Sequence, residues 1–199
     1  MSVKAVFFDI GGVIIRTEYQ APREHLAERL NLTSEDLYKA VFESETSRKA
    51  SLGTVSEDEH WNAVMGKLGR PTAEAKAIRD EFFAGDVIDK SMLDFIRSLR
   101  PRYTTGVISN AWPDMRAYIV ENKFDDAFDG LTISAEVGVM KPQPEIFQLA
   151  LEQARVQASE AVFVDDMPAN VEAANALGMR GILFRDPHKT LIELKMFLD

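Results

Sequence analysis

The 199-residue chain has no cysteine and only three histidines, at positions 25, 60 and 188. The lack of cysteine excludes disulfide bonds, thiolate nucleophiles and cysteine-ligated zinc or iron–sulfur sites. The histidines have no metal-ligand spacing, and we expect His25 and His60 to lie on the surface. No apolar run approaches the roughly 20 residues that span a bilayer, and no cleavable signal pattern precedes the first apolar run. We therefore expect a soluble, cytoplasmic protein without a membrane partner.

Positive charge is also scarce. The chain has 23 Lys and Arg against 32 Asp and Glu, which gives a net charge of -9. Nucleic-acid backbones are bound by clustered basic residues, whereas here the basic residues are scattered. We expect no nucleic-acid partner, although a local phosphate site is compatible with this charge. The sequence does not establish the oligomeric state.

Short apolar runs alternate with helical patterns over most of the chain. The runs cover residues 3–8, 105–108, 161–164 and 181–184. Continuous apolar runs of this length are typical of buried parallel strands, and the segments between them have apolar residues at helical spacing. Strands that alternate with helices predict an α/β fold with a doubly wound parallel sheet, similar to a Rossmann fold.

One segment breaks the alternation. Residues 16–85 show helical signals alone, including a capping box at Ser56 and Glu59. We expect a helical insertion at 16–85 and a core made of residues 1–15 and 86–199. The two connections should lie side by side and are placed to act as a hinge. Arg48 and Lys49 precede the Gly53 turn, and we expect this pair to reach the substrate from the insertion.

Polar residues follow three of the apolar runs. They are Asp9, then Ser109 with Asn110, then Asp165 with Asp166. Ligands of open α/β sheets bind outside the carboxyl ends of the strands, so these side chains should meet at one edge. Carboxylates packed together repel one another unless a cation neutralises them. A hard divalent ion, Mg²⁺ first, is the economical explanation.

The pattern resembles the haloacid dehalogenase (HAD) superfamily in its first subfamily, which carries a helical cap. The resemblance spans nearly the whole chain and depends on four motifs in the family's order: Val6–Ile14, Val107–Asn110, Lys141–Pro142 with Pro144–Phe147, and Val162–Asp166 with Asn170. Most members hydrolyse phosphate esters through an aspartyl-phosphate. The resemblance implies a hydrolase that acts on a small phosphorylated metabolite of the sugar phosphate type.

The resemblance also implies a role for each matching residue. Asp9 would be the nucleophile. Mg²⁺ would be held by Asp9, the backbone carbonyl of Gly11 and Asp166, with Asp165 beside the ion or reached through water. A carboxylate attacks a phosphate dianion only when the phosphoryl charge is neutralised, which explains the need for the ion.

The other motif residues would bind the phosphoryl group. Ser109 would donate a hydrogen bond to it, and Lys141 would supply positive charge to it and to Asp9. Asn110 and the backbone of the turn at Gly11 complete the expected substrate-binding set. Asn170 has a structural role in this interpretation, as a tether for Lys141.

The chain departs from the family pattern at Gly11, where most of the phosphatases have a second aspartate that acts as general acid and base. Such a group contributes roughly 10²- to 10⁴-fold in rate. Three hypotheses remain open. The first is a phosphatase whose substrate has a good leaving group, such as an anomeric sugar phosphate or an acyl phosphate, or whose acid comes from the cap or from water. The second is a 2-haloacid dehalogenase, which the aspartates beside Asp9 disfavour. The third is a non-catalytic domain that binds a ligand or a partner.

Overall fold

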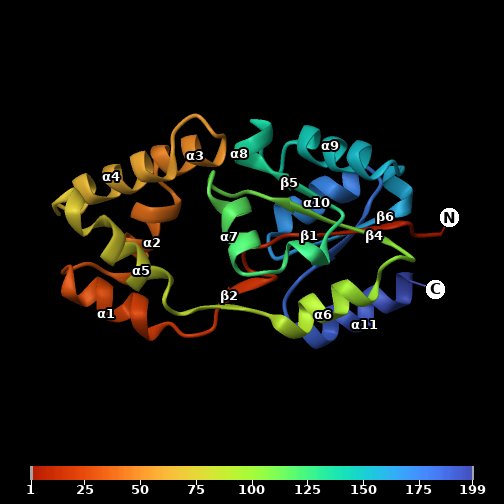
Figure 1. Ribbon diagram of the computed structural model, residues 1–199, viewed down its shortest axis with the longest axis horizontal. Helices are drawn as coiled ribbons and strands as arrows, with labels where there is room; N and C mark the ends of the chain where they lie inside the picture. Colours follow the sequence, from red (N-terminus) through yellow and green to blue (C-terminus); the bar gives the residue numbers. More distant parts are fainter. Residues whose placement is uncertain (1, 199) are drawn as a thin grey trace.

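A five-stranded parallel sheet forms the centre of the core in the computed structural model, which describes residues 2–198 (Figure 1). The strand order is β5-β4-β1-β6-β7. The strands are β1 (Ala5–Phe8), β4 (Thr104–Ser109), β5 (Gly130–Ile133), β6 (Ala161–Asp165) and β7 (Arg180–Leu183). The central strand β1 pairs with β4 on one side and with β6 on the other. The expected α/β fold with a doubly wound parallel sheet is confirmed.

Helices cover both faces of this sheet (Figure 1). Successive side chains of a strand point to opposite faces. Val6 and Phe8 therefore belong to the apolar cluster under α6, α7 and α11, while Ala5 and Phe7 belong to the cluster under α9 and α10. The helices are α6 (Lys90–Ser98), α7 (Met115–Glu121), α9 (Pro144–Ala154), α10 (Pro168–Ala176) and α11 (Pro187–Phe197). Coverage of both faces explains why the strands read as continuous apolar runs.

The insertion is helical and has an apolar cluster of its own. Its helices are α1 (Ala21–Arg29), α2 (Ser34–Phe42), α3 (Glu45–Ser51), α4 (Glu57–Lys67) and α5 (Ala75–Phe83). Leu26, Leu37 and Trp61 are among the buried residues of this cluster. The expected capping box forms at the start of α4, where Ser56 and Glu59 exchange hydrogen bonds.

A two-stranded antiparallel ribbon joins the insertion to the core. It pairs β2 (Ile15–Thr17) with β3 (Asp86–Ile88). Beyond the ribbon, the backbone N–H groups of Glu18 and Tyr19 both donate to the carbonyl of Gly85. A Cβ at Gly85 would lie 1.9 Å from the Tyr19 carbonyl oxygen, so this close approach requires glycine. The two connections lie side by side, as the sequence predicted.

Three elements do not follow from the apolar pattern. The edge strand β5 has four residues, two of them partly exposed, so it lacks a continuous apolar run. The ribbon strands have three residues each and are too short for any periodicity. Within residues 2–198, no helix is long and apolar enough to cross a membrane.

Candidate catalytic site

The polar residues at the strand ends meet at one edge of the sheet. Asp9 follows the central strand β1, so its two neighbours are the ends of β4 and β6. Ser109 closes β4 and Asp165 closes β6, with Asp166 next in the chain. Carboxylate oxygens of the three aspartates lie within 4.8 Å of one another. The strand order therefore assembles the group that the sequence predicted.

Asp9 is held through one of its two carboxylate oxygens. Its Oδ1 accepts hydrogen bonds from the backbone N–H of Ile10 and from Ser109 Oγ, both at 2.7 Å. Lys141 Nζ also lies 2.9 Å from this oxygen. Among the described residues, none donates a hydrogen bond to Oδ2. Asp9 is therefore fixed in orientation and presents a second oxygen without a protein partner.

Lys141 connects the nucleophile candidate to the fourth motif. Its side chain is buried, and Nζ lies 2.6 Å from Asp165 Oδ2 as well as close to Asp9. The main chain of Lys141 is fixed by Asn110, which donates from Nδ2 to its carbonyl at 2.9 Å and accepts from its N–H at 2.7 Å. Asn110 thus positions Lys141 with both ends of its amide. Direct contact between Asn110 and a substrate stays a prediction.

The two neighbouring aspartates have different environments. Asp165 is fully buried, and its carboxylate accepts hydrogen bonds from Lys141, the backbone N–H of Met167 and the Nδ2 of Asn170. Asn170 therefore anchors Asp165 and does not tether Lys141 directly, which corrects our expectation for this residue. No described side chain donates a hydrogen bond to the Asp166 carboxylate. Asp166 is the carboxylate of the pair whose oxygens remain open to a cation.

Burial and mutual repulsion raise the pKa of two of these carboxyl groups. The pKa of Asp9 rises to about 6, because burial disfavours its charge and Asp165 adds repulsion, while Lys141 opposes the rise. The pKa of Asp166 is also raised, first by burial and then by Asp165. Carboxylates with these shifts gain stability from a nearby cation, so the donor set fits Mg²⁺, which prefers oxygen ligands.

The turn after Asp9 lies directly against Asp166. Gly12 has φ +76°, and a Cβ there would lie 2.3 Å from Asp166 Oδ2. Glycine is needed here both for the left-handed backbone and for the close approach. By contrast, a Cβ added at Gly11 meets no atom within 4 Å. The position that lacks the second aspartate therefore has open space around it.

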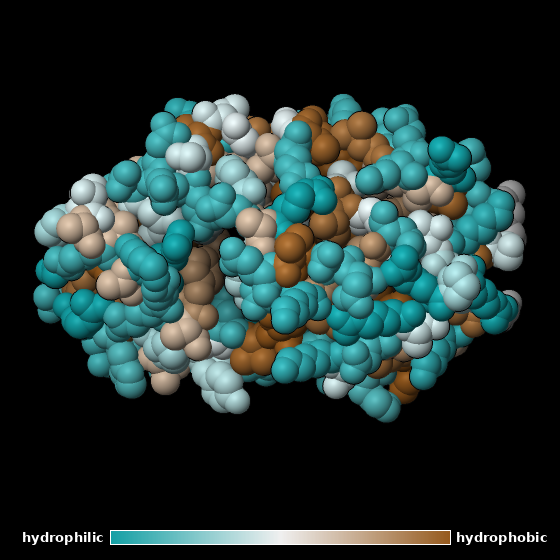
Figure 2. Space-filling model, viewed as in Figure 1, coloured by the Kyte–Doolittle hydropathy of each residue, from teal (hydrophilic) through white to brown (hydrophobic). Residues whose placement is uncertain are grey.

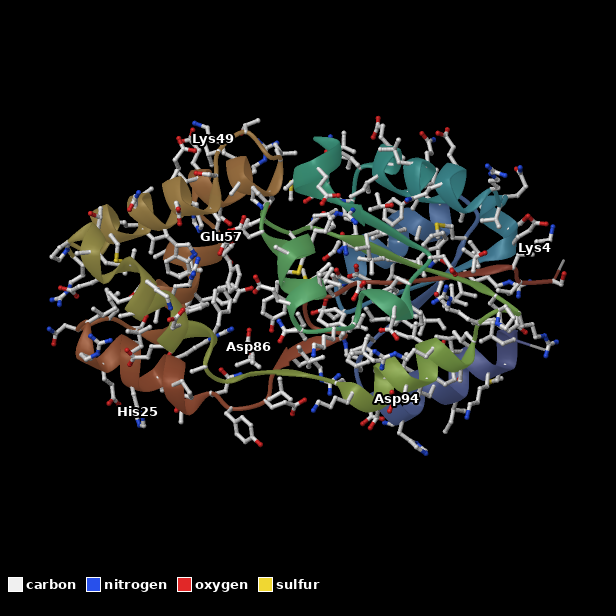
Figure 3. The ribbon with its side chains drawn as sticks, viewed as in Figure 1. Lys4, His25, Lys49, Glu57, Asp86 and Asp94 are labelled. Carbon is white, nitrogen blue, oxygen red and sulfur yellow. The ribbon has the colours of Figure 1, made fainter. Side chains whose placement is uncertain are left out.

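The expected pair on the insertion does not join this cluster. α3 buries Ser47 and Ala50, so Arg48 and Lys49 face the opposite side and are exposed. Lys49 Nζ pairs with Glu45 at 2.8 Å on the outer surface of the insertion (Figure 3). A role of this pair in substrate binding stays a prediction without support from these contacts.

His60 is not a surface residue, which corrects our expectation. It is fully buried, its Nδ1 lies 3.0 Å from Thr46 Oγ1, and burial lowers its pKa. Its ring packs against Trp112, with 4.5 Å between ring centroids. Sequence reasoning missed Trp112 as a residue near the site. The available signal was its position, three residues after Ser109 in the loop beyond β4.

The fold and the strand-end cluster agree with the comparison to known families. A model of the haloacid dehalogenase-like hydrolases matches residues 3–178. The chain belongs to this family of hydrolases, so the expected resemblance to the family is confirmed, while the subfamily and the roles of the motif residues stay predictions.

Curated relatives include proteins named as phosphatases. The sesquiterpene phosphatase astK of Aspergillus oryzae is 28% identical, over 98% of this chain and 96% of that protein. The D-ribitol-5-phosphate phosphatase of Bacteroides thetaiotaomicron is also 28% identical, over 88% of this chain and 89% of its own length. Bifunctional epoxide hydrolase 2 of Rattus norvegicus is 26% identical, over 98% of this chain but 39% of that protein. The chain thus spans about two fifths of the mammalian relative.

Solved structures share the fold. A HAD family enzyme from Bacteroides thetaiotaomicron, in complex with magnesium and inorganic phosphate, superposes with a TM-score of 0.78 at 23% identity. The match covers 94% of this chain and 96% of the other.

Proposed function

We propose that the chain is a magnesium-dependent phosphatase that hydrolyses a small phosphorylated metabolite through an aspartyl-phosphate on Asp9. The arrangement of Asp9 carries this proposal. Three donors fix its Oδ1, so Oδ2 remains as an oriented nucleophile beside Asp166. The phosphatases among the relatives and the magnesium in the related structure support it.

The ion would be held by Asp9, Asp166 and the carbonyl of Gly11, and it would supply positive charge to neutralise the phosphoryl group. Asp9 Oδ2 then forms a bond to phosphorus while the bond from phosphorus to the leaving oxygen breaks. Water attacks the phosphorus in a second step, which frees Asp9 and inorganic phosphate. Lys141 and Ser109 orient Asp9 through its Oδ1, and Lys141 reduces the repulsion between Asp9 and the incoming phosphate.

Gly11 restricts the leaving group. No carboxylic acid stands at this position to protonate a leaving alkoxide. Substrates whose leaving group departs as a stable anion fit the site. Anomeric sugar phosphates and acyl phosphates are substrates of this kind.

The same acidic cluster disfavours the dehalogenase alternative. A departing halide and the carboxylate of a 2-haloacid would both meet Asp165 and Asp166 beside Asp9. A non-catalytic binding domain has no need of the oriented free oxygen of Asp9, so this alternative is also disfavoured.

Hydrolysis assays test the proposal. Acetyl phosphate and glucose 1-phosphate should be hydrolysed with Mg²⁺ and not with a chelator, and the Asp9→Asn variant should lose activity at least about 10³-fold. Asp126→Asn is the matched control, because Asp126 is an exposed carboxylate at the far side of the core that pairs with Arg97. Acid quenching of wild-type protein with acetyl phosphate should give a phosphorylated Asp9 peptide by mass spectrometry. Chelator-resistant activity, or full activity of Asp9→Asn, would contradict the proposal.

A further inference from the structure

Aromatic side chains from the insertion and from the core meet beside the catalytic edge. Trp112 lies three residues after Ser109, whose hydroxyl donates to Asp9, so this end of the group is tied to the site by a short loop. The Trp112 ring stacks on Phe42 of α2, with 5.6 Å between centroids and 26° between planes. Both rings are partly buried against the apolar cluster of the insertion.

Tyr38 extends this group along α2. Its ring centroid lies 5.0 Å from that of Phe42, and the residue is 45% exposed. Burial is the main cause that raises the pKa of Tyr38; the charges of Glu43 and, to a smaller extent, Asp166 add to the rise, while Arg23 opposes it. We call Tyr38, Phe42 and Trp112 the aromatic face; it runs from Trp112, in the loop after Ser109, to Tyr38 on α2.

The aromatic face offers few hydrogen-bonding groups. Its own polar atoms are the Tyr38 hydroxyl and the Trp112 indole N–H. The nearby cation Arg23 is already engaged, since it donates to the Phe82 carbonyl at 3.0 Å and to Asp86 at 2.8 Å. The molecular surface is hollowed between the two lobes, and hydrophobic residues form part of the wall of this hollow (Figure 2). A leaving group rich in hydroxyls would lose hydrogen bonds to water there without replacing them, which is costly.

The reaction itself also limits the leaving group, independently of the aromatic face. With glycine at position 11, the leaving oxygen departs without protonation by a carboxylic acid there. A phenol has a pKa of about 10, like that of a tyrosine side chain, whereas the pKa of water is about 15.7 and an aliphatic alkoxide is a comparably poor leaving group. A phenolate, whose negative charge is delocalised over the ring, can therefore leave without being protonated by a carboxylic acid at position 11.

We propose that the preferred substrates are aryl phosphate monoesters, whose ring packs on the aromatic face while the phosphoryl group lies at Asp9. This inference rests on the proposed phosphatase function and narrows its substrate class. In the first step Asp9 Oδ2 bonds to phosphorus, and the bond from phosphorus to the aryl oxygen breaks with its electron pair on that oxygen. The phenolate takes a proton from water, and a second water hydrolyses the aspartyl-phosphate.

Steady-state kinetics with four probes tests the inference. Phenyl phosphate carries the ring, cyclohexyl phosphate has a similar size without aromaticity, glucose 1-phosphate carries a polyol, and acetyl phosphate reports on the catalytic edge with no ring. We expect phenyl phosphate to have a higher kcat/KM than glucose 1-phosphate and a lower KM than cyclohexyl phosphate. A preference for glucose 1-phosphate, or an equal KM for phenyl and cyclohexyl phosphate, would overturn the inference.

Two variants locate the effect on the aromatic face. In Tyr38→Leu and in Trp112→Leu, we expect the ratio of kcat/KM for phenyl phosphate to that for acetyl phosphate to fall about 10-fold, mainly through KM. Tyr38 is well exposed, so its replacement should leave folding intact. Phe95→Leu is the matched control, because this ring lies on α6 with Lys195 over it and should not affect the ratio.

The outcomes separate the two proposals. If the wild-type protein does not hydrolyse acetyl phosphate with Mg²⁺, the proposed function is wrong and the inference is wrong with it. If acetyl phosphate is hydrolysed but either variant keeps the wild-type ratio, the inference alone is wrong.

Discussion

The catalytic edge and the aromatic face lie next to each other and are built in opposite ways. At the edge, buried charged groups are fixed by hydrogen bonds of 2.6 to 2.9 Å, such as those of Lys141 and Ser109. On the aromatic face, contacts are between rings with centroids 5.0 to 5.6 Å apart, and Tyr38 is 45% exposed. From this difference we expect that mutations can separate chemistry from selectivity. Changes at the edge should impair catalysis and stability, whereas changes on the aromatic face should alter substrate preference and leave the fold intact.

The largest effect should come from replacing Lys141, the buried positively charged side chain at the catalytic edge. Lys141→Met leaves Asp9 and Asp165 as buried carboxylates without their shared partner, so we expect the free energy of unfolding to fall by about 3–5 kcal/mol. Phosphatase activity should fall at least about 10²-fold. Urea denaturation and kinetics measure both effects.

Lys4→Met is the matched control for this change. Lys4 also pairs with a carboxylate, Glu160 at 2.6 Å, but its side chain is 59% exposed and lies at the opposite end of the sheet (Figure 3). An exposed pair contributes about 1 kcal/mol at most. Equal losses in the two variants would contradict the comparison between edge and surface.

The second effect is a pH dependence of stability without metal. Folding raises the pKa of Asp9 from its ordinary value of 3.8 to about 6, so the folded protein binds this proton more tightly than the unfolded chain does. Stability from this group is full below about pH 4 and is lost as pH rises to about 6, by up to about 3 kcal/mol. In chelator, denaturation at a series of pH values should show this decline. Asp9→Asn should make the decline smaller, and what remains should come from groups such as Asp166, whose pKa is also raised.

The same denaturation series, repeated with Mg²⁺ in place of chelator, tests which groups bind the ion. The ion binds the ionised carboxylates, so its stabilising effect should be larger at pH 7 than at pH 5. An effect of equal size at both pH values would show that Asp9 and Asp166 are not the groups that bind it.

The smallest of the three effects concerns the missing acid. Gly11→Asp should be accommodated, because a Cβ at this position meets no atom within 4 Å. A carboxylic acid there can protonate a leaving alkoxide, so we expect turnover of cyclohexyl phosphate to rise about 10²-fold relative to phenyl phosphate. Gly11→Asn has the same size without a titratable proton and should give no such gain. A gain in both variants would mean that position 11 acts through shape.

The sequence predicted the edge better than the aromatic face for a physical reason. The apolar runs are local signals, and a parallel sheet brings the residues after them, such as Asp9 and Asp165, to one edge. Lys141 follows no strand, so it was placed by the family resemblance alone. The strand order that puts Asp9 between Ser109 and Asp165 appears in the structure and not in any local pattern.

Long-range packing explains the errors. His60 is buried because Trp112, more than fifty positions away, covers it. The outward orientation of Arg48 and Lys49 depends on which face of α3 packs inward, and a seven-residue helix gives too few apolar positions to define that face. The two aspartates also differ for a reason that only the folded loop shows. Asn170 and the backbone of Met167 donate hydrogen bonds to the Asp165 carboxylate, whereas no described side chain donates one to Asp166.

The ribbon of β2 and β3 has a mechanical consequence. Its two strands are paired at three positions, from Ile15 with Ile88 to Thr17 with Asp86, and Gly85 continues the pairing to Tyr19. Sliding one connection past the other would break this ladder, whereas bending both together preserves it. We therefore expect any movement of the insertion relative to the core to bend the two strands of this ribbon together (Figure 1).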